Sequence, residues 1–413
     1  MATLFYIHAT WRWTYFVGII YAAVAIAGTF FFYFPPSRPQ HDFEKSRWQE
    51  FKDLDFIGLL LFTGGLTIFL VGITYLGRSD YSKSLVGSTI PIGAIIFIGA
   101  FVYDFTIPKN PIFPFKLLSM FRKYTVHLIV LFISGMIWQA IVTLGPQATL
   151  WMYTNDPVEI GKTLIPSNFS GVLGGWIMPS LLHKIKHIRY QILFALLMQT
   201  AFTASYAAVV PHHKPAWMAM QLFGQSCFTW VTSLAYVSSS LYVPLEELGV
   251  SAGLIGTFRS AGGSVGNAVF STILNNVVDN NLSDDIVAAA LGAGYPANNI
   301  GQLIPAVIQN AAGVPNAFAG VPDVTSAVIA ATGTALRNSY AHAFRLVFYS
   351  TIPFCVIAFA AAWFVSDPSH LLNNHVAVHQ EREVLAQIEH KRHEHEHGHG
   401  NGHGHSKEAG VIV

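Results

Sequence analysis

The chain has 413 residues, of which 52% are hydrophobic and only 11% are charged. A soluble globular protein carries about 25% charged residues, so the few charges here must leave long apolar stretches between them. The 23 basic and 22 acidic residues nearly cancel, which excludes the strongly basic surface that binds nucleic acid.

Nine stretches of the chain are long and apolar enough to cross a bilayer. A spanning helix needs about 20 mostly apolar residues, and only helices or closed barrels satisfy their backbone polar groups in lipid. These stretches lack the alternation of barrel strands, so the predicted fold class is all-α, a polytopic transmembrane helical bundle in a lipid bilayer. In chain order they are residues 15–34, 56–76, 85–103, 124–144, 161–182, 190–210, 216–236, 250–273 and 343–365.

Lysine and arginine gather in alternate connecting segments, which indicates how the bundle is oriented. Short cytoplasmic segments are rich in these residues, and here they concentrate in 35–55, 106–123, 183–189 and the tail after 366. Residues 274–342 then form a long external loop, in which alanine-rich segments predict short helices broken by Gly and Pro. This loop carries Asn281 in an Asn-Leu-Ser tripeptide, a potential glycosylation acceptor.

The fourth, fifth, seventh and eighth stretches, and the outer end of the fourth, contain polar and aromatic residues suited to an organic ligand. Such sites are mostly apolar and aromatic, with a few placed hydrogen-bonding groups. Each of these residues alone also suits helix packing, but as a group they favour a bulky, neutral organic substrate over an inorganic ion. The candidate substrate-binding residues are Trp138, Gln139, Gln147, Asn168, Trp176, Gln221, Gln225 and Asn267, with Arg259 added for the reason given next. The stretch 56–76 offers no candidate.

Arg259 is the single charge in the stretch 250–273. A charge inside the membrane is costly and usually faces the bundle interior or a wet cavity. Small residues spaced by four let another helix approach closely. Two roles for Arg259 remain open: it binds an anionic group or gates a cavity, or it donates hydrogen bonds to a neighbouring helix as a structural residue. Gly253 and Gly256 lie along one helical edge that gives Arg259 room, whereas Gly262 and Gly266 form a pair spaced by four. Together with Gly263 they are the glycines of the expected structural motif.

None of the nine stretches holds an Asp or Glu in its core. Proton-driven transporters commonly use intramembrane carboxylates or histidines as relays. His127 lies near the cytoplasmic end of its stretch, where an interfacial role is expected. If protons are the coupling ion, we therefore expect the proton-binding carboxylate to lie in a part of the protein that this chain does not contain.

The C-terminal tail, 367–413, is polar and ends in the histidine-rich string "HEHEHGHGNGHGH" at 393–405. Histidine clusters can bind zinc, copper or nickel, but alternating glycine prevents a fixed geometry, and we expect a disordered cytoplasmic tail. We expect no metal site and no cofactor. Cys227 and Cys355 both lie in apolar runs, which predicts buried, unpaired thiols.

Several strings of the sequence resemble one family of transporters, from about residue 11 to 368. The family is that of the fungal trichothecene efflux pumps, which also includes siderophore transporters and belongs to the 14-span major facilitator transporters. The strings are "WRWTYFVGII" at 11–20, "FYFPPSRP" at 32–39, "DLDFIGLLLFTGGLTIFLVGITYLG" at 53–77, "NDPVEIGKTLIPSNFSGVLGGWIMPSLL" at 155–182, "LGVSAGLIGTFRSAGGSVGNAVF" at 248–270 and "NSYAHAFRLVFYSTIPF" at 338–354.

The resemblance implies a partial major facilitator fold in which the nine stretches are spans six to fourteen. Residues 1–34 are then the last span of the N-terminal half, starting with the motif Trp11, Arg12 and Trp13. Residues 35–105 are linker helices, and 106–366 are the C-terminal six-helix half with its external loop 274–342. The first five spans are absent, which implies either a piece of a longer transporter or a genuine short protein.

The resemblance also implies a function. It indicates a membrane transporter, not an enzyme, that exports small, largely apolar organic molecules such as toxins or drugs and is proton-coupled in its complete form. A siderophore transporter and a non-transporting partner or regulator are the alternatives. The plasma membrane is the expected location, with the vacuolar membrane as the alternative.

Overall fold

The computed structural model describes residues 10–34, 55–76, 83–107, 111–244 and 247–372, and every regular element in these ranges is helical. The prediction of an all-α fold is therefore confirmed. The chain divides into two units, one made of residues 1–50 with 373–413 and the other of residues 51–372. The histidine-rich string at 393–405 lies outside the described residues.

In the first unit the described residues form one helix, α2 (Arg12–Phe32), which contains no acidic residue in its first turn and no basic residue in its last. Aromatic side chains surround its start. The ring of Trp11 meets that of Tyr15 edge to face at 5.8 Å, and the guanidinium of Arg12 lies 5.6 Å from the centre of the Trp11 ring. Trp and Tyr favour the membrane–water interface, so this end of α2 suits the bilayer surface.

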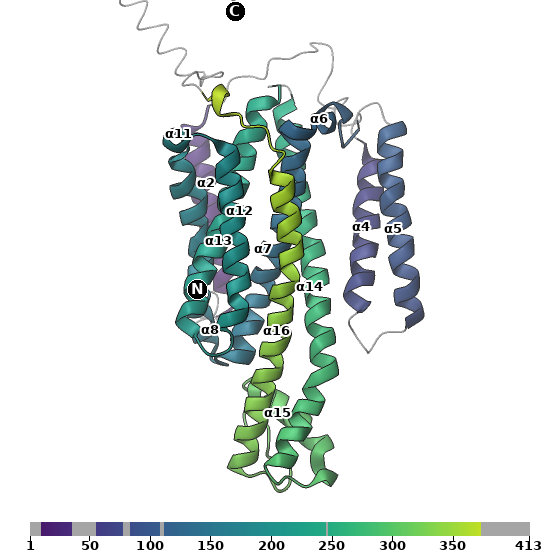
Figure 1. Cartoon of the computed structure of the whole chain (residues 1–413), viewed down its shortest axis with the longest axis vertical. Helices are drawn as coiled ribbons and strands as arrows, with labels where there is room; N and C mark the ends of the chain where they lie inside the picture. The colour runs from purple at the N-terminus through teal and green to yellow at the C-terminus, as the bar shows by residue number, and fades with distance from the viewer. Residues whose placement is uncertain (1–9, 35–54, 77–82, 108–110, 245–246, 373–413) are drawn as a thin grey trace, which may run out of the picture. The chain divides into compact units, whose positions relative to one another are not determined.

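The second unit is a bundle of long helices joined by short ones (Figure 1). Helices α7, α12, α13, α14 and α16 lie side by side and form the core of the unit, and α4 packs on α5 and contacts α14. In chain order the helices are α4 (Phe56–Leu76), α5 (Lys83–Thr106), α6 (Phe115–Ser119), α7 (Val126–Met152), α8 (Pro157–Thr163), α9 (Ile165–Val172), α10 (Met178–Ser180), α11 (Leu182–Ile185), α12 (Ile188–Val209), α13 (Lys214–Tyr242), α14 (Leu248–Gly292), α15 (Ile300–Ala311) and α16 (Ser326–Ala362).

Six helical stretches of the described residues have the length and apolar character to cross a membrane, against nine predicted from the sequence. Helices α13 and α14 are long enough, with 29 and 45 residues, but they are more polar. The stretch predicted at 161–182 is instead a series of short elements with a π-helical turn, Leu173–Ile177, at the Gly-Gly pair. Pro166 and Pro179 each lie in the first turn of one of these short helices, where proline is tolerated.

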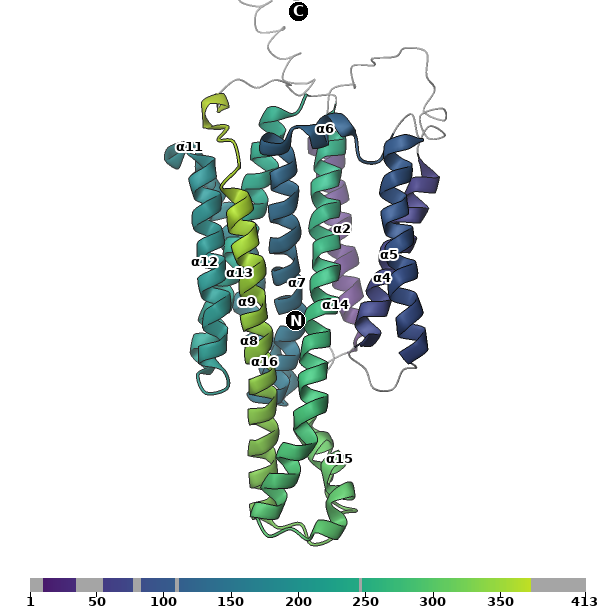
Figure 2. The same ribbon diagram turned by 45° about the vertical axis from the view of Figure 1, so that its right-hand side comes forward.

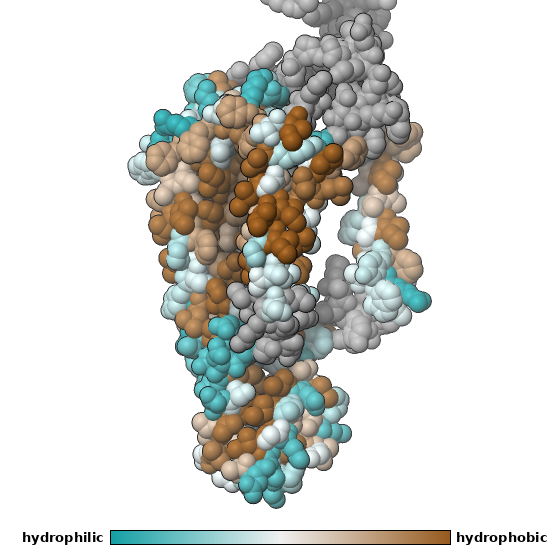
Figure 3. Space-filling model, turned by 90° about the vertical axis from the view of Figure 1, so that its right-hand side faces the viewer, coloured by the Kyte–Doolittle hydropathy of each residue, from teal (hydrophilic) through white to brown (hydrophobic). Residues whose placement is uncertain are grey.

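The surface of the second unit fits a lipid environment. Apolar side chains such as Phe194, Leu197, Val356 and Ile357 are each more than half exposed. Figure 3 shows hydrophobic side chains over much of the middle of the visible face, with hydrophilic ones gathered toward its ends. Lipid tails solvate such side chains without the cost that water would impose.

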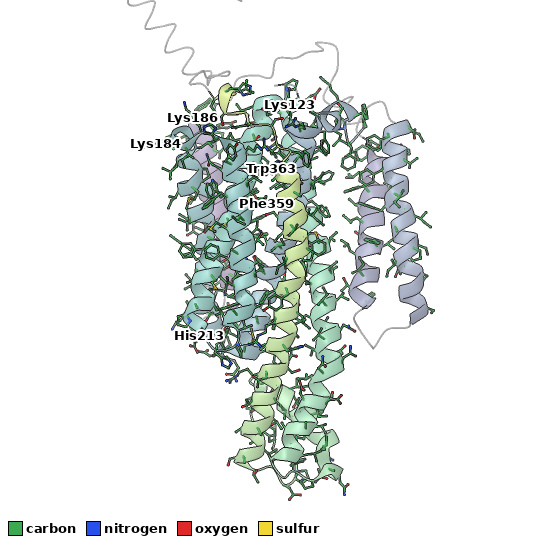
Figure 4. The ribbon with its side chains drawn as sticks, in the orientation of Figure 1. Lys123, Lys184, Lys186, His213, Phe359 and Trp363 are labelled. Atoms are coloured by element: carbon green, nitrogen blue, oxygen red, sulfur yellow. The ribbon has the colours of Figure 1, made fainter. Side chains whose placement is uncertain are left out.

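The basic residues support the orientation inferred from the sequence. Lys123, Lys184 and Lys186 lie at one end of the unit, and His213 lies at the other (Figure 4). The connecting segments 106–123 and 183–189 therefore reach the same side of the bundle, as the alternation of lysine and arginine predicts. This end is the one predicted to be cytoplasmic, and we call the opposite end of the bundle its outer end.

Helices α14 and α16 continue well beyond the membrane, where the sequence predicted a loop of short helices. At 1.5 Å per residue, the 45 residues of α14 span about 68 Å, roughly twice the hydrocarbon core of a bilayer. The helix does not end near residue 273 but continues to Gly292, and α16 begins at Ser326. Together with α15 these ends form a helical extension at the end of the bundle opposite the lysines (Figure 2).

The helical extension has its own packed interior. Leu282, Ile286, Leu303, Val307 and Leu336 are all buried. Only part of the expected connection, between Gly292 and Ser326, lies outside the two long helices, and α15 provides 12 of its residues. Asn281 is exposed on this extension, and its side-chain amide donates a hydrogen bond to the carbonyl of Val277 at 2.7 Å.

Helices α4 and α5 form a hairpin whose contact is made by glycine. A Cβ placed on Gly65 would meet the backbone nitrogen of Phe97 at 2.6 Å, and one placed on Gly93 would collide with the backbone of Phe69. The two helices therefore touch through their backbones at two points. The α4–α5 hairpin joins the bundle near its outer end, where the hydroxyl of Thr272 donates to the carbonyl of Ile73 at 3.0 Å.

Candidate functional site

Helices α7 and α14 touch through their backbones, because glycines of both helices lie at the crossing. A Cβ placed on Gly262 would overlap the carbonyl oxygen of Phe132, and one placed on Gly266 would overlap that of Met136. A Cβ on Gly263 would lie 3.1 Å from the Cβ of Gln139. Three of the glycines selected from the sequence thus lie at this contact.

The other two selected glycines do not take part in the crossing. Gly253 has open space where a side chain would project, and a Cβ on Gly256 would approach the hydroxyl of Tyr236 at 3.4 Å. Both line a cavity described below instead of a helix contact. The structure thus divides these glycines of α14 into two groups, one at the helix crossing and one beside a cavity.

Beside the crossing, side chains of α7 and α14 surround a cavity of about 380 Å³, which we call the α7–α14 cavity. It contains four of the nine substrate-binding candidates. The ring of Trp138 is held by stacking on Phe228 of α13, with ring centres 4.8 Å apart. The lining residues are Trp138, Gln139, Arg259, Ser260, Gly263, Ser264 and Asn267.

Three polar side chains of this cavity make no strong hydrogen bond within the described part of the chain. Within the described ranges, the guanidinium of Arg259 makes no hydrogen bond and no ion pair. The buried side-chain oxygen of Asn267 has no partner there either. The amide of Gln139 reaches the hydroxyl of Thr143 only at 3.5 Å, which is a weak contact. These groups can therefore bind a ligand.

Arg259 lies at about half the depth of the membrane. It is the twelfth residue of α14, so it lies about 16 Å from the first residue of a helix that must cross roughly 30 Å of hydrocarbon. Of its two possible roles, the structural one requires hydrogen bonds to neighbouring helices, and the side chain of Arg259 makes none to the described helices. Arg259 is instead one of the residues that line the α7–α14 cavity.

A second cavity, of about 510 Å³, lies between α4 and α14, and we call it the α4–α14 cavity. Phe62 and Leu66 of α4 form one wall, although the sequence offered no candidate on that helix. Their residue types match any lipid-facing helix, so only the tertiary packing identifies them. The residues of α14 that line it are Gly253, Gly256, Thr257, Arg259, Ser260, Ala261 and Ser264.

The other five candidates line neither cavity. Gln221 and Gln225 are buried on α13, and both amide atoms of Gln225 lack a partner among the described residues. Gln147, Asn168 and Trp176 are exposed, and the amide of Asn168 donates to the carbonyl of Leu164 within its own helix. The structure therefore brings together Trp138 and Gln139 of α7 with Arg259 and Asn267 of α14, and the other five candidates lie elsewhere.

No group of three or more His, Cys, Asp or Glu side chains in the described part of the chain could hold a metal ion. Cys227 and Cys355 are both buried and unpaired, as the sequence predicted. His127 is almost fully buried in α7, and neither ring nitrogen has a partner among the described residues.

The sequence of the chain matches that of a known family over nearly its whole length. The matching family is described as the fungal trichothecene efflux pump family, and the match covers residues 2–401. The chain belongs to this family. The resemblance inferred from the sequence motifs is thereby confirmed.

Three relatives show how the chain compares with proteins of this kind. It is 26% identical to the MFS-type transporter prx5 of Penicillium rubens over 372 residues, which are 88% of the chain and 66% of the relative. It is 25% identical to the trichothecene efflux pump TRI12 of Fusarium sporotrichioides, over 90% of the chain and 62% of the relative. It is 27% identical to the pump of the same name of Trichoderma arundinaceum, over 90% of the chain and 63% of the relative.

The chain thus spans 62 to 66% of the length of these relatives. Family membership and the apolar helices together show a membrane protein of the transporter type, not an enzyme.

Proposed function

We propose that this protein, in its complete form, exports small, largely apolar organic molecules across a membrane. The observation that carries the proposal is the α7–α14 cavity, in which Trp138, Gln139, Arg259 and Asn267 converge at mid-membrane. Its volume of about 380 Å³ lies within the usual range of small-molecule sites. The printed names of the relatives, two of them trichothecene efflux pumps, support the same function.

The lining of the cavity favours an organic molecule over a metal cation. A hard cation needs several oxygen ligands and usually carboxylates, whereas this cavity holds a guanidinium and no acidic residue. The ring of Trp138 offers an apolar surface, and the side chains of Gln139 and Asn267 offer hydrogen bonds. An oxygen-bearing, largely apolar molecule satisfies all of these groups.

Proton coupling and the plasma membrane, with the vacuolar membrane as the alternative, are part of the proposal. Transport sites commonly form at the midplane between two structural repeats, and α7 to α16 would supply one of these, with α4 and α5 as linker helices. The chain covers about two thirds of its relatives, so the second half of the site and the proton-binding carboxylate would come from the rest of the protein.

Efflux measurements on cells that express the protein in its complete form test this proposal. Cells preloaded with a radiolabelled trichothecene should lose it faster than cells with an empty vector, and a protonophore should abolish the difference. Asn267→Ala and Gln139→Ala should each slow efflux by roughly tenfold, the effect of one lost hydrogen bond at the site, at normal membrane abundance.

Val356→Ala is the matched control, since Val356 is exposed on α16 and lines neither cavity. Efflux no faster than that of the empty vector would overturn the function. Normal efflux by both cavity variants would overturn the assignment of the site, and efflux that a protonophore leaves unchanged would overturn the coupling.

A further inference from the structure

Arg259 belongs to both cavities. The α7–α14 and α4–α14 cavities share Arg259, Ser260 and Ser264 as lining residues and differ in the rest. Arg259 therefore lines both a polar, aromatic site on α7 and a space whose other wall is formed by Phe62 and Leu66 of α4.

The electrostatics of the shared region favour an anion. No Asp or Glu lines either cavity, and the guanidinium of Arg259 has no partner in the described part of the chain. An unpaired charge in a medium of low dielectric constant interacts strongly with an opposite charge. The planar guanidinium also matches carboxylate, sulfonate or phosphate groups with two parallel hydrogen bonds.

The wall on α4 favours an apolar body attached to that anion. Phe62 is held in a cluster of rings, with centres 5.4 Å from Phe97 and 5.3 Å from Phe113. On the α14 side, the hydroxyl of Thr257 already donates to the carbonyl of Gly253 at 2.9 Å. The hydroxyl of Thr257 therefore does not require a hydrogen bond from a ligand, and its methyl group can contact an apolar body.

The α4–α14 cavity also has room for such a body. Gly253 leaves open space on α14. The hydrogen bond between Thr272 and Ile73 joins α14 to α4 about two turns beyond Ser264. The cavity therefore lies nearer the middle of the membrane than this attachment of the α4–α5 hairpin.

We infer that the α4–α14 cavity is a second binding site, for amphiphiles that carry an anionic group. The anion binds Arg259, and the apolar part lies against Phe62 and Leu66, between the α4–α5 hairpin and the bundle. The inference rests on the proposed function in one respect: it takes the α7–α14 cavity as the transport site that shares Arg259. An exported organic anion and an anionic phospholipid have the same chemistry, so the experiment must separate them.

Binding to the full chain in phosphatidylcholine nanodiscs tests the inference. The probes are radiolabelled dodecanesulfonate, which stays ionised, and dodecanol, its neutral counterpart, both corrected for uptake by empty nanodiscs. Dodecanesulfonate should bind at least about tenfold more tightly, as expected for a charge-assisted hydrogen bond. Arg259→Gln should remove this preference, and Arg259→Lys should retain part of it.

A pair of matched variants locates the site. Ala261 lines only the α4–α14 cavity, so Ala261→Trp should fill it and weaken dodecanesulfonate binding by about tenfold or more. Ala360→Trp makes the same change at an exposed position of α16 and should have no effect. Equal binding of both probes, or unchanged binding in Ala261→Trp, would overturn the inference.

Two further measurements assign the occupant and separate this inference from the proposed function. Nanodiscs that also contain phosphatidylserine show whether an anionic lipid displaces the probe. Displacement that requires Arg259 supports the site with a lipid as its occupant, and its absence supports an organic anion. Asn267→Ala should slow efflux but leave dodecanesulfonate binding intact. Loss of binding in this variant would show that the two cavities act as one site and would overturn the inference.

Discussion

The position of Arg259 depends on glycines, whose lack of a side chain lets α7 and α14 approach closely. A Cβ on Gly135 would meet the carbonyl oxygen of Arg259 at 2.5 Å and its Cγ at 3.4 Å. Glycine at this position of α7 therefore lets both the backbone and the side-chain stem of Arg259 lie against that helix. The same absence of side chains operates at Gly262 and Gly266, so a single methyl group can change the site.

Gly262→Ala tests this dependence. The added Cβ would overlap the carbonyl oxygen of Phe132, so α7 and α14 must move apart and lose contacts along their crossing. We expect a loss of about 1–3 kcal/mol in stability, the usual cost of overpacking, measured as thermal unfolding in detergent. Gly249→Ala, on the same helix with open space around it, is the control. An equal loss in both variants would contradict the packing argument.

A salt bridge outside the membrane gives a pH-dependent prediction. The Nζ of Lys214 lies 2.6 Å from the Oε1 of Glu159, and the hydrogen bond from Lys214 lowers the pKa of Glu159 below its ordinary value near 4.5. A lowered pKa means that the contribution to stability is complete above the ordinary value and is lost as the pH falls through the lowered one. Lys214→Gln should therefore lower the melting temperature at pH 7, and the difference should shrink as the pH falls through the lowered pKa of Glu159. A difference that does not change with pH would exclude the ion pair as its cause.

At the scale of whole helices, the sequence predicts where apolar runs lie better than it predicts where helices end. The run at 250–273 was found, but α14 continues for nineteen residues beyond it, to Gly292. The reason is visible in hindsight as apolar residues at every fourth position, namely Leu274, Val278, Leu282, Ile286 and Ala290, all of which are buried. This spacing is typical of one face of an amphipathic helix. It predicts that the helix continues although polar residues lie between the apolar ones.

The candidate site was predictable in part for a related reason. Trp138, Gln139, Arg259 and Asn267 are polar or aromatic residues inside apolar runs, and such residues are usually functional or buried. Phe62 and Leu66 carry no such signal, because an apolar residue in an apolar helix is the default. Their place in the α4–α14 cavity results from how the α4–α5 hairpin packs on α14, which depends on contacts distant in sequence.

The start of α12 depends on a segment that follows α16, which leads to a prediction about this element. The carboxylate of Asp367 accepts a hydrogen bond from the backbone nitrogen of Ile188 at 3.1 Å, at the N-terminus of α12. Burial raises the pKa of Asp367, but hydrogen bonds from Ser369 and the nearby His187 outweigh it, so the pKa lies below its usual value. The carboxylate therefore stays charged at neutral pH and acts as a helix cap supplied by a distant segment.

Asp367→Ala should cost about 0.5–2 kcal/mol of stability, the usual range for a lost helix cap. The loss should be accompanied by faster hydrogen exchange in the first turn of α12, and acid should destabilise the unmodified protein at this point only as the pH falls through the lowered pKa. Asp285→Ala removes an exposed aspartate of α14 and should change neither quantity. Unchanged exchange at α12 in Asp367→Ala would show that the helix start is held by other contacts.

At the scale of the molecule, two helices of the helical extension, α14 and α16, pass from lipid into water along their length. Helices α14 and α16 cross the membrane with an apolar surface and then continue outside it, where Leu282 of α14 and Leu336 of α16 are buried. The ring of Trp151, at the outer end of α7, stacks on that of Tyr340 of α16 with centres 4.7 Å apart. This stack connects the base of the extension to the helix that carries Trp138 and Gln139.

Leu303→Ala tests whether the helical extension is an independent part of the fold. The side chain is fully buried in α15, so its loss should cost about 2–5 kcal/mol. If the extension unfolds locally, hydrogen exchange should rise across 274–342 while ligand binding at the α7–α14 cavity stays normal. Leu291→Ala, at a position that is about half exposed, is the control. Weakened ligand binding in Leu303→Ala, and an equal effect in Trp151→Ala, would instead show that the extension is coupled to the cavity through the Trp151–Tyr340 stack.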